Sequence, residues 1–99
     1  MDSILQQDQS ICYLCGQPAG YADPLDKHHI FGGALRKKSE EEGLWVKLHH
    51  FKCHQFGPEA VHQNAAVRQD LQAQAQLAWM DEHGKSIEDF RMLFYKSYV

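Results

Sequence analysis

Residues 44–54 read LWVKLHHFKCH, and this stretch decides the fold that we expect. Its first half, Leu44 to Leu48, is rich in the aromatic and β-branched residues that predict a strand. Its second half presents His50 and Cys53 with two residues between them, a spacing that lets both side chains reach one metal ion. The stretch therefore predicts a strand with metal ligands at its end.

The size and composition of the chain also favour a bound metal. A domain of 99 residues, 43% of them apolar, buries a modest fraction of its surface and is often stabilised further by a disulfide or a bound metal. The chain has 7 histidines, and most of them gather in its middle: His28, His29, His49, His50, His54 and His62. The 3 cysteines are odd in number, and the chain begins without a secretory pattern. We expect a cytoplasmic protein with free thiols and no contact with a membrane.

A pair of cysteines in turn-forming sequence, Cys12 and Cys15, has the same spacing as His50 and Cys53. Together these four residues predict a structural zinc site. His49 is an alternative to His50, with one more residue before Cys53. A redox dithiol or buried thiols would be the other explanation of the first pair, and Cys53 alone could be a small core residue. The shared spacing favours zinc.

A second strand is expected over Lys27 to Phe31, and it carries two adjacent histidines. Because successive strand side chains point to opposite faces, one of His28 and His29 can bind a metal while the other faces a water. Hydrolysis of a phosphodiester needs a divalent ion and also a base, with a pKa near the working pH, that activates the attacking water. A pair of exposed surface histidines would be the other explanation.

Three more residues, all later in the chain, are candidates to complete such a site. His54 follows the predicted zinc ligands, and His62 lies at the start of an expected long helix. Asn64, the only asparagine, could orient the water or the phosphate through its amide. Both His62 and Asn64 could equally be capping or surface residues at a helix start.

The remaining sequence predicts one domain with two helices at its end. Residues 1–10 are polar, and we expect a frayed lead-in to a domain over residues 11–99. Apolar spacing predicts a long helix from near Pro58 to about Glu82. Ser86 and Asp89 have the spacing of a capping box that opens a final helix. The expected order is knuckle, strand, strand, helix, helix.

The only dense group of cations lies in the loop expected between the strands, from Arg36 to Glu42. Arg36, Lys37 and Lys38 could contact the phosphates of DNA, which position a substrate without reading its bases. They could equally balance the glutamates that follow them on a solvated surface. The net charge of −3 by itself argues neither for nor against nucleic-acid binding, but with so little positive charge we expect weak binding, or binding helped by a partner protein.

These motifs together resemble the HNH endonucleases, and more narrowly the small HNH-like proteins of phages and prophages. The likeness runs from Ile11 onward through Cys12-x-x-Cys15-Gly16, His28-His29-Ile30-Phe31-Gly32-Gly33, Arg36-Lys37-Lys38-Ser39, His50-x-x-Cys53-His54 and Val61-His62-Gln63-Asn64. It implies an α+β fold: a small ββα-metal (HNH, His-Me finger) domain with a zinc knuckle and two carboxy-terminal helices. It also implies metal-dependent endonucleolytic cleavage of DNA in phage recombination or packaging, inside the host cytoplasm.

The resemblance assigns roles by position. His29 would be the general base, His28 a metal ligand, His54 the closing ligand and His62 a further ligand. The cofactors would be structural zinc and a catalytic Mg, Mn, Ni or Zn ion. The chain departs from the family where Gly43 replaces a central asparagine that ties the hairpin, where His50 replaces a zinc cysteine, and where residues 55–58 lengthen the segment after His54.

Two other functions fit the same residues. A zinc-binding module that contacts DNA or protein without catalysis would hold one ion, between the cysteines. An RNA-directed or toxin-like nuclease would use the same site as a DNA enzyme. A count of bound ions tests the first alternative, and a panel of substrates tests the second.

Overall fold

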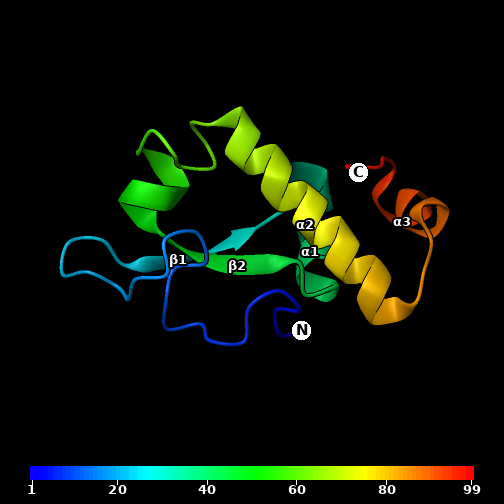
Figure 1. Cartoon of the computed structure of the whole chain (residues 1–99), viewed down its shortest axis with the longest axis horizontal. Helices are drawn as coiled ribbons and strands as arrows, with labels where there is room; N and C mark the ends of the chain where they lie inside the picture. Colours follow the sequence, from blue (N-terminus) through cyan, green and yellow to red (C-terminus); the bar gives the residue numbers. More distant parts are fainter.

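The computed structural model describes all 99 residues, and a two-stranded antiparallel sheet lies at its centre (Figure 1). Strand β1 spans Leu25–His29 and strand β2 spans Trp45–His49. Both predicted strands exist, but β1 lies two residues earlier than expected and β2 one residue later. β1 ends before Phe31 because the Phe31 N–H is donated to Ser39 Oγ, at 3.2 Å, instead of to a strand partner.

A helix replaces the loop that we expected between the strands. The 3-10 turn η1 (Gly33–Leu35) leads into helix α1 (Arg36–Glu41). Gly33 has a φ of 58°, a left-handed conformation that glycine adopts at no steric cost. The buried Ser39 Oγ donates to Leu44 O at 2.5 Å, so it ties α1 to the start of β2. Ser39 thus makes the hairpin tie that Gly43, without a side chain, cannot make.

The long helix α2 (Ala65–His83) begins later than predicted. Six residues after β2 form a turn of π-type helix, η2 (His50–Gln55), and an irregular turn follows it. α2 begins only after Asn64, whose Oδ1 accepts the N–H of Val67 at 3.1 Å as an N-cap. His62 therefore lies in the turn before α2 and not in its first helical turn. None of the helices combines the length and the apolar character that crossing a membrane requires.

Helix α3 (Ile87–Phe94) confirms the predicted capping box. Ser86 Oγ accepts the Asp89 N–H at 3.2 Å, and the Asp89 carboxylate accepts the Ser86 N–H at 3.0 Å. Phe90 and Phe94 pack on Phe31, with ring centroids 5.7 and 4.9 Å away. α2 runs past the hairpin towards α3, and one apolar core joins the sheet to both helices (Figure 1).

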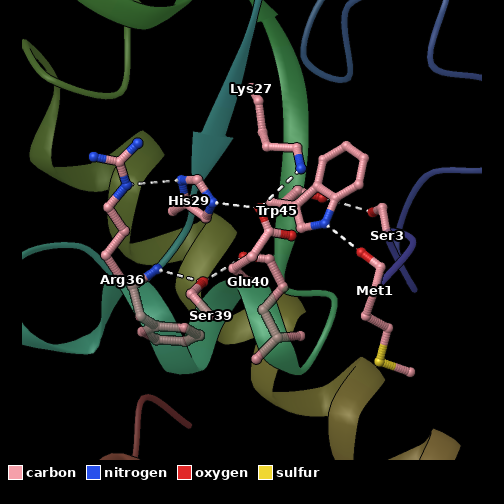
Figure 2. A network of polar contacts seen from close by, with 10 residues as sticks. Met1, Ser3, Lys27, His29, Arg36, Ser39, Glu40 and Trp45 are labelled. Atoms are coloured by element: carbon pink, nitrogen blue, oxygen red, sulfur yellow. Dashed lines mark hydrogen bonds and ion pairs between the residues drawn. The ribbon is translucent and has the colours of Figure 1, made fainter.

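The amino-terminal residues pack against β2, so the expectation of a frayed lead-in is wrong. Ser3 Oγ donates to Trp45 O at 2.6 Å, and Trp45 Nε1 donates to Met1 O at 2.9 Å (Figure 2). The buried Gln6 accepts the Lys47 N–H on its amide oxygen at 2.8 Å. Polar side chains in this segment therefore satisfy main-chain groups of β2 that have no strand partner.

Candidate metal centres

Two side chains of the amino-terminal turn meet two from the end of the hairpin: Cys12, Cys15, His49 and Cys53. Their ligand atoms all lie within 4.8 Å of one another. The chain turns between the first two cysteines because the Gly16 N–H is donated to Cys12 O at 2.8 Å. Both Cys12 and Cys53 are buried. This cysteine group is close enough to hold a metal ion.

The ring of His49 is held in the tautomer that a metal ligand needs. Its Nε2 lies 2.8 Å from the main-chain oxygen of Pro18, which can only accept, so Nε2 carries the proton. Nδ1 therefore carries the lone pair, and it lies 3.2 Å from Cys15 Sγ. A carbonyl behind a histidine is the usual partner that orients a ligating imidazole. The residues thus fit an ion that the sulfurs and this nitrogen would share.

The geometry corrects our first choice of the fourth ligand, because His50 points away from the cysteines. Two intervening residues suit an extended knuckle, but the chain winds into η2 directly after His49. His49 is the residue just before η2, and the first turn of this segment brings Cys53 back beside its ring. His50 Nδ1 lies instead 2.5 Å from Asp26 Oδ2. The alternative that the sequence left open, His49, lies with the cysteines.

The electrostatics of the thiols also favour a cation. Burial opposes ionisation of Cys12, but the N–H groups of Cys15, His49 and Leu14 point at its sulfur and lower its pKa to about 7. Burial and the sulfurs of Cys12 and Cys15 raise the pKa of Cys53 to about 12. Adjacent thiolates repel one another, and a divalent ion removes this repulsion because it binds them in their ionised form.

A second group consists of three imidazoles from three different segments: His28 of β1, His54 of η2 and His62 of the turn before α2. The ring of His54 lies 4.9 Å from that of His28 and 4.8 Å from that of His62, centroid to centroid. His28 Nδ1 and His54 Nε2 are 3.2 Å apart. Two nitrogens bound to one tetrahedral ion at about 2.0–2.1 Å lie about 3.3 Å apart, so this spacing fits a shared metal.

Asp26 orients His54 within this histidine group, and sequence reasoning missed it. Asp26 Oδ2 lies 3.0 Å from His54 Nδ1, so the proton sits on Nδ1 and the lone pair of Nε2 faces His28. Burial opposes ionisation of Asp26, but hydrogen bonds from His54 and His50 lower its pKa. A signal was present: Asp26 precedes His28 by two residues in a strand, which places both on one face.

Two imidazoles of the histidine group, the buried His28 and the more exposed His62, resist protonation. Burial first, and then the neighbouring His54, His62 and His29, lower the pKa of His28 to about 3. Burial also lowers the pKa of His62, followed by the charges of His54 and Arg68. A histidine binds a metal only in its neutral form. Both residues therefore keep a lone pair for an ion at neutral pH.

His29 points away from the histidine group, as the alternation of a strand predicts. Its Nε2 lies 3.1 Å from Glu40 Oε1, and its Nδ1 lies 3.3 Å from Arg36 Nε (Figure 2). An open hollow of about 280 Å³ is nevertheless lined by His29 together with His28, His54, His62, Lys27 and Arg36. His29 thus faces the same space as the histidine group without belonging to it.

Asn64 does not reach this hollow, so its proposed catalytic role is not supported by the geometry. Its Oδ1 caps α2 at Val67, and its Nδ2 donates to Pro58 O at 3.3 Å. Both ends of the amide are occupied by main-chain groups. The capping role that the sequence left open accounts for this residue.

The three predicted DNA-contacting cations have different surroundings. Arg36 lines the hollow beside His29, and Lys37 is exposed, with 89% of its side chain accessible. Lys38 is instead held by the carboxy-terminal helix, where its Nζ donates to Leu93 O at 2.8 Å and to Tyr95 Oη at 3.0 Å. The expectation for Lys38 is corrected: its ammonium group fastens α1 to α3.

No protein-family model, no curated protein and no solved structure matches this chain. The cysteine group, the histidine group and the residues that line the hollow are therefore the features that indicate a function. Between them they contain every sequence-predicted metal ligand except His50, which lies with Asp26 and His54 in a third group of possible ligands.

Proposed function

We propose that this chain is an HNH-type endonuclease that hydrolyses DNA phosphodiester bonds with a divalent ion held by the histidine group. We also propose that the cysteine group holds a structural zinc. One observation carries the first proposal: three imidazoles meet at an open hollow that a fourth imidazole, His29, also lines. Structural zinc sites are closed by four ligands, whereas catalytic sites keep a position open.

The three imidazoles would leave at least one position of a tetrahedral ion free. When bound, the ion would neutralise charge that develops on the phosphate and on the leaving oxygen. His28, His54 and His62 would hold it, and Asp26 would keep His54 in the ligating tautomer. Imidazole ligands suit Zn or Ni better than Mg or Mn, which prefer oxygen ligands.

His29 is the residue placed to take a proton from the attacking water. Its ring lies on the opposite face of β1 from His28, so it cannot share the ion and stays available as a base. An imidazole can act as a base near neutral pH without special tuning. The proximity of this base to the ligand group within one hollow supports a hydrolytic rather than a structural role.

Arg36 and Lys37 are the residues that would contact the DNA backbone. Arg36 lines the hollow of the histidine group and also a neighbouring hollow of about 600 Å³, which Lys37 and Gly33 line with it. A strand laid across both hollows would bring its phosphates to Arg36 and Lys37. Because Lys38 is bound elsewhere and the net charge is −3, we expect weak binding that a partner protein would strengthen.

The resemblance to HNH endonucleases supports the order of these parts along the chain. A hairpin with adjacent histidines comes first, and a helical segment then returns a histidine to the same ion. The proposed link to phage or prophage DNA recombination or processing depends on this resemblance alone.

Plasmid nicking combined with metal counting tests the proposal. Wild type should carry two ions per chain and nick DNA with Zn or Ni. His29→Ala should abolish nicking while it keeps both ions, and His83→Ala, which alters a histidine at the far end of α2, should leave the rate unchanged. Full activity in His29→Ala would remove His29 as the base. One ion per chain without nicking by wild type would favour the non-catalytic zinc-binding module.

A further inference from the structure

Two side chains of α1 determine which nitrogen of His29 can accept a proton. Arg36 Nε lies 3.3 Å from His29 Nδ1, and an arginine can only donate, so Nδ1 carries the lone pair. The proton of the neutral ring therefore sits on Nε2, from which it is donated to Glu40 Oε1 at 3.1 Å (Figure 2). The arrangement makes Nδ1 the basic nitrogen.

We propose that Glu40 is a positioning residue for His29: it fixes the ring with Nδ1 as the basic nitrogen and stabilises the imidazolium that forms during hydrolysis. This inference rests on the proposed function. In the step, a water proton moves to Nδ1 while the water oxygen forms a bond to phosphorus. The ester bond between phosphorus and the leaving oxygen breaks, and the leaving oxygen keeps that electron pair and takes a proton from solvent.

Glu40 is suited to this role because its carboxylate is fixed and ionised. Lys27 Nζ donates to Glu40 Oε1 at 2.9 Å, the same oxygen that faces His29. The hydrogen bond from Lys27, followed by that from His29, lowers the pKa of Glu40 to about 2. Glu40 also follows Ser39, which ties α1 to the sheet. A carboxylate behind a general base works in this way in hydrolytic triads.

Arg36 covers Nδ1 while no substrate is present. Because Arg36 lines both hollows, a phosphate in either one competes with Nδ1 for its guanidinium group. A planar guanidinium binds a phosphate oxygen pair more strongly than a neutral nitrogen. The substrate would therefore uncover the base that Glu40 has oriented.

The orientation of His29 can be measured without any enzymatic assay. Nitrogen-15 spectra of the imidazoles, recorded on the metal-loaded protein, distinguish the two neutral tautomers. We expect His29 to carry its proton on Nε2 in the wild type and to show both tautomers in Glu40→Ala. A proton on Nδ1 in the wild type, or identical spectra in both proteins, would overturn the inference.

Single-turnover nicking at saturating DNA measures the catalytic consequence. Glu40→Ala should slow the chemical step about 100-fold or more, within the range that general-base catalysis contributes. Glu40→Gln keeps an acceptor for the Nε2 proton but lacks the charge, so its rate should lie between those of the wild type and Glu40→Ala. Glu88→Ala is the control, since it removes the same charge from an exposed residue of α3, whose carboxylate pairs with Arg91.

A wild-type rate in Glu40→Ala, or an equal loss in Glu40→Ala and Glu88→Ala, would contradict a positioning role. If Glu40→Ala fails to fold, Glu40→Gln decides: a rate equal to wild type would likewise contradict the stabilising charge. If the wild type itself nicks no DNA with any ion, the proposed function fails and the catalytic role of Glu40 fails with it. The tautomer measurement would still decide whether Glu40 orients His29.

Discussion

Asp26 Oδ2 lies 3.0 Å from Nδ1 of His54, and this contact decides which nitrogen of His54 faces the histidine group. The same oxygen lies 2.5 Å from His50 Nδ1. One carboxylate therefore holds two histidines of η2 against β1. Its removal would free His54 to rotate or to change its tautomer.

We expect Asp26→Asn to weaken metal binding at the histidine group about 10- to 100-fold, as the loss of an orienting partner does in other metal sites. Titration of the zinc-loaded protein with Ni²⁺ measures this affinity by calorimetry. Asp70→Asn makes the same change of charge at an exposed position of α2 and should bind Ni²⁺ like the wild type. Equal affinities in Asp26→Asn and the wild type would contradict the orienting role.

The adjacent histidines at the end of β2 should behave differently when each is replaced. His49→Ala should lose the ion of the cysteine group and lower the melting temperature, because the binding energy of a structural metal contributes to folding. His50→Ala should keep that ion, since His50 faces Asp26 instead. Elemental analysis of the two purified variants, together with their thermal unfolding, makes the comparison. Loss of zinc in His50→Ala alone would reverse the assignment.

Ser39→Ala should destabilise the fold without touching either ligand group. The Phe31 N–H would lose its partner in the core, which costs about 1–3 kcal/mol for a buried donor. Urea unfolding at saturating zinc measures the loss. Ser10→Ala, at an exposed position, should change the free energy of unfolding by less than about 0.5 kcal/mol. Equal effects of the two substitutions would show that the hairpin is tied in another way.

On acidification, the ion of the histidine group should dissociate at a lower pH than it would from histidines with an ordinary pKa. The pKa of His28 is lowered to about 3 and that of His62 is lowered too, mainly by burial. A lone pair is present above the pKa and lost as the pH falls through it, so a lowered pKa preserves binding to lower pH.

Three histidines with a pKa near 6.5 would lose about 50-fold in affinity between pH 7.5 and 6. We expect the Ni²⁺ affinity of this protein to fall by less than about 14-fold over that range, since His28 stays neutral throughout and the pKa of His62 is lowered as well. Calorimetric titrations at several pH values provide the test. A fall as steep as that of ordinary histidines would show that burial does not protect these ligands.

Sequence reasoning succeeded where the structure depends on neighbouring residues. The capping box of Ser86 and Asp89 needs only one turn of chain, and it was predicted correctly. The turn that brings Cys12 and Cys15 together is equally local. Such patterns carry their own hydrogen-bond partners, so no knowledge of the rest of the fold is needed.

Prediction failed where distant contacts decide the local backbone. The choice between His49 and His50 depends on the winding of η2, which no residue pattern announced. Helix α1 exists because Ser39 bonds to both ends of the hairpin connection, a contact that appears only when the strands pair. The sequence alone does not distinguish Glu40 from the solvated glutamates beside it. Only its pairing with Lys27 and His29 in the folded chain does so.

Cys53 and His54 are consecutive residues of η2, yet one lies with the thiols and the other with the imidazoles. A single peptide bond therefore couples the two centres mechanically, and the protein should acquire its ions in a set order. Zinc bound to the sulfurs would first fix the position of η2, and His54 would then be placed to bind the second ion. A chelator that removes zinc from the cysteine group should therefore also release the ion of the histidine group, and adding zinc back before nickel should restore both.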